Sequence, residues 1–533
     1  MKKIFLLALL AKSMLFAQNV KLTWSPEIEL KKKEFISDII HADKTGIYYT
    51  KAKRAGMYAA AFGARPKFET VEKLSPSFST IFSKEVTAFE DDDIAIRSID
   101  FAKDGFLVFL SKYSRKEGGS KYFVSNMDMN ANIKGTPKEY LSITEETFAK
   151  VANTFISPSY DSTKFLVLAE REQSRHNKKE EEKVILTVFN NSGTKEWQKT
   201  IKIDGKTDGA VNIIQQQIAP NGDIYFLLKE YTTEKIKETI KDANGNKTPG
   251  YKFRVLKVTD KGATVKNFAV DLGKSYINSA DIKINTQNNN LICSGFYNDQ
   301  DNEVLKGLFY FEIDNTGNVT RKNNKDFPQE FVEEFKKNKG TKKDKKNNDD
   351  DDLGLSKSFT VDKVYARADG GAYLLAEFYY TYTRCYTTSS GTRCNTYYIH
   401  NDILTVNISA DGTIDWFHRI PKKQTEVNIH KYSSYISTMY KDNLYVLFND
   451  NPKNQEIEED EKSATTANYK KAVCMLQKID KDKNVTKKEL FKNEDLEKIL
   501  CPFASRVLSE NTIILFADRY RDNDAKLGKI VIE

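Results

Sequence analysis

The chain has 533 residues, with 83 Lys or Arg against 75 Asp or Glu and a formal net charge of +8. This charge is small for the length and mixed along the chain, which excludes the clustered basic surface that nucleic-acid binding needs. A chain this long would ordinarily divide into several domains, but the internal repeats described below favour one large domain.

The N-terminal segment has the pattern of a secretory signal peptide. Two early lysines precede an apolar run over residues 4–10, and the small residue Ala17 closes the segment. The apolar stretch is too short to span a bilayer, because a transmembrane helix needs about 20 apolar residues. We expect residues 1–17 to be removed and residues 18–533 to form the mature chain. The alternative is that the segment is an N-terminal core strand.

Export would place the mature chain outside the cytoplasm, in the periplasm, at the cell surface or secreted. The first cysteine after the signal is Cys293, so no cysteine is placed to carry a lipid at the mature N-terminus. No other apolar run is long enough to cross a membrane. The sequence therefore predicts no transmembrane segment and leaves peripheral membrane association open.

The strongest pattern along the chain is a repeated hairpin. An alternating apolar run leads into a tight turn of Asp, Asn, Gly or Lys, and a second apolar run follows. Alternation is typical of half-buried strands, and Asn, Asp and Gly supply the backbone freedom that hairpin turns need. Eight copies occur, with turns around Asp43, Asp104, Asp161, Asn221, Asn288, Asp369, Asp442 and Asn511.

A second hairpin follows most of these copies, as in VILTVFNNSGTKEWQKTI and ILTVNISADGTIDWFHRI. Two successive hairpins make one four-stranded antiparallel sheet, and eight such sheets around an axis make a β-propeller. We therefore predict an all-β fold, an eight-bladed β-propeller formed by residues 18–533 as a single domain. A seven-bladed ring is the alternative.

Two copies of the second hairpin share a Gly-x-x-x-Trp element, at Gly193–Trp197 and Gly412–Trp416. This element resembles the repeat of quinoprotein-like β-propellers, and the resemblance implies that the tryptophan docks between neighbouring blades. Other copies have Phe268, Val319 or Val485 near this place. No set of cofactor ligands accompanies the element, so the resemblance extends to the architecture and not to redox chemistry.

The last repeat has only three strand-like segments, around residues 504–508, 512–517 and 527–533. The mature N-terminus begins with the alternating segment Val20–Trp24, which could supply the missing fourth strand. An open sheet edge invites wrong pairing, and closure removes it. We predict that Val20–Trp24 completes the last blade and closes the ring.

The long connections are predicted to lie on one face of the propeller. Hairpin turns within a blade lie on one face, whereas the middle connection of a blade and the blade-to-blade connections lie on the other. Because variable loops on a rigid scaffold usually build binding sites, we expect this second face to be the working face. Its long segments are residues 171–183, 231–251, 326–358, 379–400 and 450–470.

The insertion over residues 326–358 begins with PQEFVEEFKK, which predicts a short helix, and continues as a stretch rich in Lys and Asp. Such a stretch buries too little apolar surface to offset its ordering entropy, so we expect disorder. The run Asp349–Asp352 could attract calcium, but adjacent carboxylates without fixed spacing are more often simply solvated.

Residues 379–400 are predicted to form a hairpin stabilised by a disulfide. Cys385 and Cys394 lie at equal distances from a Thr/Ser/Gly turn, so they can face each other across a two-stranded ribbon, and export implies an oxidising compartment. Six tyrosines surround the pair: Tyr379, Tyr380, Tyr382, Tyr386, Tyr397 and Tyr398.

These tyrosines have a structural explanation, because tyrosine is a good strand former. They also have a functional one, because tyrosine gives a large contact area at a small entropic cost. The candidate partner contacts are Tyr382, Tyr386, Tyr397 and Tyr398.

The sequence carries no linear motif of a known reaction. HExxH, GxSxG and a complete phosphate loop are all missing, and Asp480-x-Asp482-x-Asn484 has Phe491 where a calcium loop needs Glu. We therefore predict no catalytic residue, metal or cofactor. The histidines, none at ligand spacing to another, are His41, His176, His400, His418 and His430.

Two hypotheses about function remain. The first is an exported, non-catalytic binding or scaffold propeller that contacts a protein, peptide or glycan through its long-loop face. The alternative is a hydrolase or lyase with an acidic site at the central funnel, where residues from several blades would escape any linear motif. Perturbed carboxylates or histidines converging at the funnel would favour the enzyme, and a broad loop surface would favour the binding protein.

Overall fold

The computed structural model describes residues 20–53, 69–86, 94–114, 118–144, 152–171, 182–203, 211–233, 237–241, 243, 245, 247–273, 275–299, 304–337, 355–356, 358–389, 391–458, 461–519 and 523–533. The predicted signal peptide and the run Asp349–Asp352 lie outside this part of the chain.

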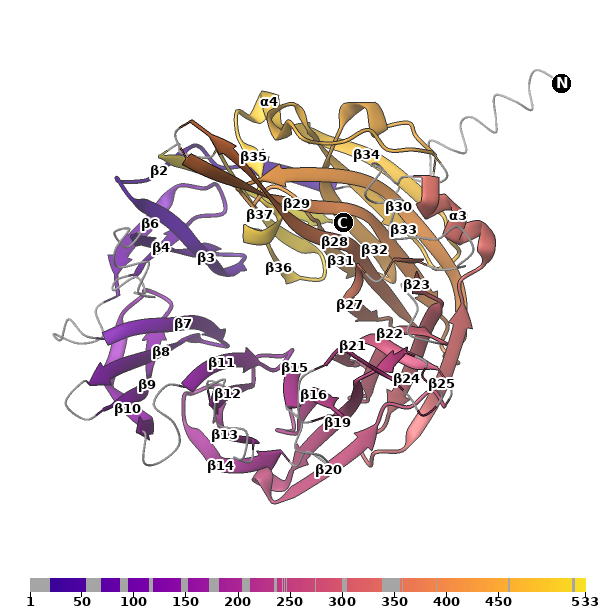
Figure 1. Cartoon of the computed structure of the whole chain (residues 1–533). Coiled ribbons are helices and arrows are strands. Elements are labelled where there is room, and N and C mark those ends of the chain that lie inside the picture. The colour runs from indigo at the N-terminus through magenta and orange to yellow at the C-terminus, as the bar shows by residue number, and fades with distance from the viewer. Residues whose placement is uncertain are drawn as a thin grey trace.

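In the described residues, seven four-stranded antiparallel sheets and one six-stranded sheet form eight blades around a central axis (Figure 1). The first strand of each sheet lies nearest the axis, and the later strands follow outward. Blade 1 has β3 (Glu34–Asp43), β4 (Gly46–Lys53), β5 (Glu69–Leu74) and β6 (Thr80–Glu85). Blade 2 has β7 (Ile94–Ala102), β8 (Gly105–Ser114), β9 (Gly119–Asp128) and β10 (Ile133–Thr144). Blade 3 has β11 (Ala152–Pro158), β12 (Lys164–Arg171), β13 (Glu182–Asn190) and β14 (Lys195–Ile203).

The next blades carry the longer insertions. Blade 4 has β15 (Val211–Ile218), β16 (Ile224–Tyr231), β19 (Tyr251–Thr259) and β20 (Thr264–Ala269). Blade 5 has β21 (Tyr276–Ile284), β22 (Leu291–Asn298), β24 (Gly307–Ile313) and β25 (Val319–Asp326). Blade 6 has β27 (Phe359–Ala366), β28 (Ala372–Thr388), β29 (Gly391–Ile408) and β30 (Ile414–Val427). Blade 7 has β31 (Ile436–Tyr440), β32 (Asn443–Asp450), β33 (Val473–Ile479) and β34 (Val485–Lys492).

Blade 8 closes the ring with strands from both ends of the chain. It has β36 (Arg506–Ser509), β37 (Thr512–Asp518), β38 (Asp524–Ile532) and β1 (Val20–Trp24), with β2 (Ile28–Glu29) and β35 (Ile499–Leu500) as short additions. The register runs from Val20 opposite Ile532 to Trp24 opposite Gly528. The Trp24 ring then meets Phe491 of blade 7 edge-on, with ring centroids 5.1 Å apart. The prediction that the N-terminal strand completes the last blade is confirmed.

Short elements decorate the connections. The small pairs are β17 (Thr239–Lys241) with β18 (Lys247–Pro249) and β23 (Val304–Leu305) with β26 (Leu355–Ser356). The helices are α3 (Gln329–Lys337), α4 (Asn493–Leu496), η1 (Asp260–Gly262), η2 (Pro452–Asn454), η3 (Tyr469–Lys471) and η4 (Pro502–Ala504). Helix α3 places Phe331, Val332 and Phe335 in the core between blades 5 and 6. No helix of the described residues is both long and apolar enough to cross a membrane.

The hydrophobic core is divided among the blade interfaces. The described residues form eight clusters of buried side chains, one between each pair of neighbouring blades. The second strand of a blade contributes side chains to two of these clusters, because successive side chains point to opposite faces of a strand. In β8, Leu107 and Phe109 pack toward blade 3 while Val108 packs toward blade 1. The ring of interfaces confirms the eight-bladed prediction over the seven-bladed alternative.

Both tryptophans of the Gly-x-x-x-Trp element contact the following blade. The Trp416 indole N–H donates to the Lys481 carbonyl oxygen of blade 7 at 2.9 Å. Trp197 packs on the cluster between blades 3 and 4 and lies beside Gly262, where an added Cβ would come 3.4 Å from its ring. This docking between blades is what the resemblance to quinoprotein-like propellers implied for these two residues.

Deleting residues 18–25 tests the closure of the ring. The deletion removes β1, leaves the edge of β38 unpaired and removes the contact between Trp24 and Phe491. We therefore expect the free energy of unfolding to fall by about 3–5 kcal/mol. The measurement is urea unfolding of the wild type and the deletion variant. Lys21→Ala, which changes an exposed side chain of the same strand, is the control and should shift stability by less than about 0.5 kcal/mol. A deletion variant with an unchanged midpoint and cooperativity would show that β1 does not close the ring.

Candidate functional site

Blade 6 carries a projection that no other described blade has. Strands β28 and β29 continue past the edge of the blade as a ribbon, with pairs running from Tyr379 opposite His400 to Thr388 opposite Gly391. We call residues 379–400 the arm. The sequence predicted a two-stranded ribbon, but its base has a third strand, because β30 pairs with β29 as far as Val427 opposite Tyr397. The arm is the connection between the second and third strands of blade 6, the kind of connection that we predicted to lie on the face of the long connections.

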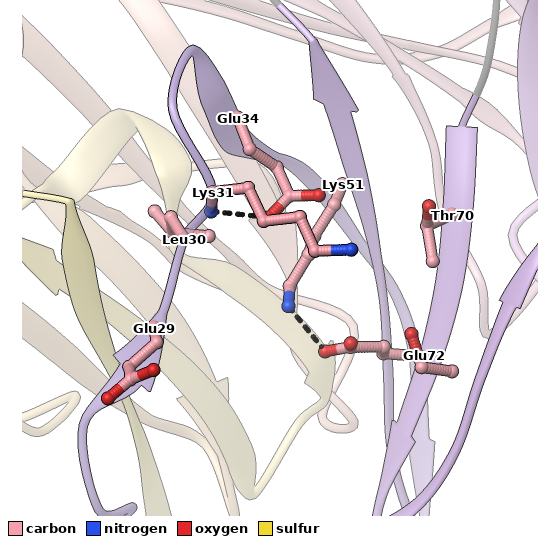
Figure 2. Close-up of a pocket in the computed structure, with 8 residues that line it drawn as sticks. Glu29, Leu30, Lys31, Glu34, Lys51, Thr70 and Glu72 are labelled. Carbon is pink, nitrogen blue, oxygen red and sulfur yellow. Dashed lines mark hydrogen bonds and ion pairs between the residues drawn. The ribbon is translucent and has the colours of Figure 1, made fainter.

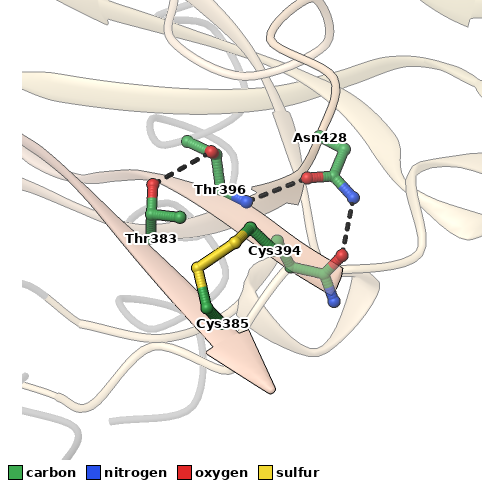
Figure 3. The surroundings of a disulfide bond; sticks show 6 residues. Thr383, Cys385, Cys394, Thr396 and Asn428 are labelled. Atoms are coloured by element: carbon green, nitrogen blue, oxygen red, sulfur yellow. Dashed lines mark hydrogen bonds between the residues drawn. A yellow bond between two sulfur atoms is a disulfide. The ribbon is translucent and has the colours of Figure 1, made fainter. Parts of the chain in front are cut away.

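The disulfide predicted in the arm is present. Cys385 and Cys394 are directly opposite each other and are joined through their Sγ atoms (Figure 3). On the β29 side, Asn428 continues the pairing beyond β30: its Oδ1 accepts from the Thr396 N–H at 2.8 Å, and its Nδ2 donates to Asn395 Oδ1 at 2.9 Å. The three remaining cysteines, Cys293, Cys474 and Cys501, are unpaired and buried.

One face of the arm gathers aromatic and cationic groups, and we call it the tyrosine face. The rings of Tyr382 and Tyr397 stack at 4.7 Å, and Tyr380 stacks on Tyr382 at 6.1 Å. The Arg384 guanidinium lies 5.2 Å from the Tyr382 ring centroid and 5.7 Å from that of Tyr397. Tyr386, 48% exposed, lies farther out, opposite Arg393. Three of the four candidate contacts therefore share this face.

The fourth candidate contact, Tyr398, lies on the opposite face of the ribbon, which we call the histidine face. The His430 ring, from the connection between blades 6 and 7, stacks on Tyr398 with centroids 4.5 Å apart. Phe503 of η4, 54% exposed, meets His430 edge-on at 4.7 Å. Tyr379 and His400 complete this aromatic surface at the base of the arm, with centroids 4.4 Å apart.

Beneath the histidine face lies a buried polar cluster. Glu377 accepts hydrogen bonds from the Lys422 ammonium at 2.6 Å and the Ser434 hydroxyl at 2.9 Å, and it bonds His400 Nδ1 at 2.7 Å. Burial alone would raise the pKa of Glu377, but the Lys422 charge and the bond with His400 lower it to about 2. An ionised carboxylate only accepts, so the Nδ1 of His400 carries a proton.

This cluster positions His430. His400 Nε2 and His430 Nε2 are 2.8 Å apart, and when both rings are neutral the proton between them belongs to His430, since His400 is protonated on Nδ1. Burial and the neighbouring His400 lower the pKa of His430 below its ordinary value. Ser434 donates to Glu377, whose pKa of about 2 makes it a weak base, so this contact does not activate the hydroxyl as a nucleophile. The cluster fixes the histidine face and supports the arm.

Sequence reasoning placed none of the five histidines near another. His400 and His430 meet because β29 pairs with β30, which brings the connection after β30 back over the base of the arm. The unusual length of the hairpin indicated where the site lies. No spacing in the sequence indicated that His400 and His430 meet. Among the described residues, no three His, Cys, Asp or Glu side chains gather as a metal site. The Asp480–Asn484 segment forms a hairpin turn, in which Asp480 accepts from the N–H groups of Asp482 and Asn484.

The innermost strands carry the carboxylates that an enzyme at the funnel would need. Burial raises the pKa of Asp281 in β21 to about 7, and burial with the nearby Glu377 charge raises that of Asp362 in β27 to about 7. Asp100 in β7 is also raised, by burial. These three groups belong to blades 5, 6 and 2, and Asp362 accepts a hydrogen bond from the Tyr435 hydroxyl at 2.9 Å.

A pocket of about 380 Å³ lies beside blade 1, where the chain enters from β2 (Figure 2). Its two buried charges, Lys51 and Glu72, pair at 2.9 Å, and the Tyr49 hydroxyl also donates to Glu72. The buried charges of this pocket are therefore already engaged within the protein. The lining residues are Glu29, Leu30, Lys31, Glu34, Lys51, Thr70, Glu72 and Ser83.

No family model and no curated protein matches the chain. Among solved structures, the WD40 domain of SCAP from fission yeast is 10% identical, with a TM-score of 0.36 over 96% of this chain and 98% of that one. The β-propeller domain of the Trilobed protease from Pyrococcus furiosus is 11% identical, with a TM-score of 0.31 over 73% and 93% of the two chains. An ulvan lyase of polysaccharide lyase family PL25 is 6% identical, with a TM-score of 0.34 over 88% and 96%. Likenesses at this level carry no argument about activity, and the fold assignment rests on the strand order and the eight interfaces.

Replacing both arm cysteines by serine should loosen the arm and leave the ring folded. The closed loop is short, so the disulfide restrains the unfolded chain by at most roughly 3 kcal/mol, and no arm residue from 379 to 398 belongs to a core cluster of the described residues. We expect faster amide exchange between Tyr379 and His400 in the Cys385→Ser/Cys394→Ser variant. Exchange elsewhere in the ring, measured in the same experiment, is the control. Global loss of protection would contradict the view that the arm is an addition to a complete ring.

Proposed function

We propose that this chain is an exported binding propeller that holds a protein, peptide or glycan against the arm of blade 6 and catalyses no reaction. Export is supported by the pattern of residues 1–17 and by a disulfide in the mature chain, since such bonds persist in oxidising compartments. The candidate contacts are Tyr382, Tyr386 and Tyr397 on the tyrosine face, with Tyr398 on the histidine face. This assignment would place the protein in the periplasm, at the cell surface or in the medium.

One observation carries the proposal: several interactions hold the shape of the arm, although its residues 379–398 add nothing to the core clusters of the described residues. The disulfide, the Asn428 bonds and the stacked tyrosines hold its shape. Strand propensity explains why tyrosine is accepted in this ribbon. It does not explain why the shape of the ribbon is held although residues 379–398 add nothing to a core cluster of the described residues. A rigid surface rich in Tyr and Arg loses little entropy on binding, which favours a contact site.

The side chains of the tyrosine face already pack against one another in the protein without a partner. Arg384 spans the stacked pair of Tyr382 and Tyr397, and Val427, 41% exposed, extends the face at its base. Tyrosine, arginine and an exposed aliphatic group are the composition of an interface core rather than of an ordinary solvated surface. The face therefore combines a large aromatic contact area with hydroxyl and guanidinium groups that can hydrogen-bond a partner.

The raised pKa values of Asp281 and Asp362, both about 7, support a second candidate, a hydrolase or lyase acting at the central funnel. A carboxylic acid that is half protonated near neutral pH suits general acid catalysis. The Asp362 carboxylate already accepts a hydrogen bond from the Tyr435 hydroxyl, and neither Asp281 nor Asp362 lines the pocket beside blade 1. For this reason we rank the enzyme below the binding protein.

The double variant Tyr382→Ala/Tyr397→Ala tests the binding proposal. It removes the stacked pair at the centre of the tyrosine face, and hot-spot aromatic residues contribute about 2 kcal/mol or more, so affinity should fall by roughly thirtyfold. Wild type, double variant and Tyr113→Ala are immobilised and exposed to extracellular proteins and to a glycan array. Tyr113, 49% exposed on blade 2, is the matched control.

A species retained by the wild type and by Tyr113→Ala, but lost by the double variant, would support the arm as the contact site. The three proteins should unfold within about 2 °C of one another, since the pair lies outside the cores. Equal retention of every bound species by the double variant would contradict the proposal.

A further inference from the structure

The arm has one edge that no strand covers. Strand β27 pairs with β28 only as far as Phe359 opposite Phe378, and the Tyr379 N–H then donates to the Ser358 carbonyl oxygen at 3.0 Å. From Thr381 to Thr387, no strand of the described residues pairs with this side of β28. We call this stretch the free edge. The opposite edge of the ribbon is covered at its base by β30 and Asn428.

The alternation of hydrogen bonding along β28 shows which backbone N–H and C=O groups point away from β29. The Cα atoms of Cys385 and Cys394 are 4.0 Å apart, the close spacing of a pair that exchanges no hydrogen bonds with its partner strand. The N–H and C=O of Cys385 therefore point away from β29, and those of Thr381, Thr383 and Thr387 share its phase. The outward N–H of Tyr379, bonded to Ser358, agrees with this phase.

The free edge lacks the usual protection against pairing. Proteins blunt exposed edges with proline, lysine, bulges or very short strands. The segment Thr381–Thr387 reads TYTRCYT, with no proline and with Arg384 as its one charged residue, and its pairing with β29 is regular throughout. Thr381, Thr383 and Cys385 are all exposed. An extended segment can add to such an edge through main-chain hydrogen bonds.

Charge favours an acidic occupant. Residues 378–400 contain Arg384 and Arg393 and no Asp or Glu. A strand added beside β28 would place alternate side chains next to Tyr382, Arg384 and Tyr386, at the short separations where cross-strand pairs interact. An acidic residue there would pair with Arg384. A second copy of the arm would instead bring its own two arginines against these two, and like charges across strands are destabilising.

We propose that the arm binds an extended acidic peptide segment, which adds as a strand to the free edge of β28 and lays alternate side chains on the tyrosine face. This inference rests on the proposed function and deepens it, since it selects a peptide from the three partner classes. Main-chain bonds to residues 381–387 would supply affinity, and Arg384 with Tyr382 would select the sequence.

The probe is the peptide acetyl-(Val-Glu)4-Val-amide, with a lysine version and two N-methylated versions that block alternate backbone N–H groups in one phase or the other. Binding is measured by calorimetry, and amide exchange is followed at Thr381, Thr383 and Cys385. We expect the acidic peptide to bind at least tenfold more tightly than the lysine peptide. One N-methylated phase should lose binding, the other should keep it, and the three amides should become protected.

Reversing the arm charges in Arg384→Glu/Arg393→Glu should abolish the preference for the acidic peptide. The matched control is Lys241→Glu/Lys247→Glu, which makes the same charge change on the exposed pair β17–β18 of the same face and should keep the preference. This control separates a local contact from the net charge of the protein.

Three results would overturn the inference: no binding of the acidic peptide, equal binding of both N-methylated peptides, or protection of the three amides in the free protein. The last would mean that the chain itself or a second copy already occupies the edge. None of these results touches the proposed function, which fails only if the Tyr382→Ala/Tyr397→Ala variant retains every partner of the wild type.

Discussion

Seven blades take all their strands from contiguous stretches of chain, and the eighth is shared between the two ends. The pairs from Val20 opposite Ile532 to Trp24 opposite Gly528 hold the first and last strands together. Each blade packs on two neighbours, so an unclosed ring would separate one interface between blades and expose both of its faces, rather than fray a single strand. Every other feature depends on this closure, because the eight separate cores give no blade enough buried surface to stand alone.

The rigidity of the ring is what allows an arm to exist. Among the described residues, no other element pairs with the outer end of the arm, so its orientation is set where it leaves blade 6. There Glu377, Lys422 and His400 form a buried charged cluster. Burying charges is costly, and removing one partner of such a pair leaves the other uncompensated at about 3–5 kcal/mol. A cluster of this kind defines one geometry for the base of the arm and for His430 above it.

Local chemistry explains what the sequence could predict. The eight hairpins follow from strand alternation and from turn residues such as Asn221 and Asp369, both of which act over a few positions. The pairing of Cys385 with Cys394 follows in the same way, because a short symmetric hairpin fixes its own register. Trp197 and Trp416 could be placed between blades because the surrounding element was recognisable.

Apart from the closure of the ring by Val20–Trp24, features that depend on distant segments could not be predicted. His430 reaches His400 through the path of a connection, and Phe503 arrives at the same surface from the connection between blades 7 and 8. The four candidate tyrosines were expected as one group, but strand alternation places Tyr398 on the face opposite Tyr382 and Tyr397. The third strand at the base of the arm is the extension of β30 along β29. No turn residues in the sequence indicated this extension.

Amide hydrogen exchange of the unmodified protein tests ring closure most directly. If β1 is an integral strand of blade 8, its amides open only with global unfolding and should exchange within about tenfold of those in β37. The buried strand β37, at the centre of the same blade, is the internal reference. Exchange of Val20–Trp24 that is several orders of magnitude faster, with β37 still protected, would contradict a ring closed by its N-terminal strand.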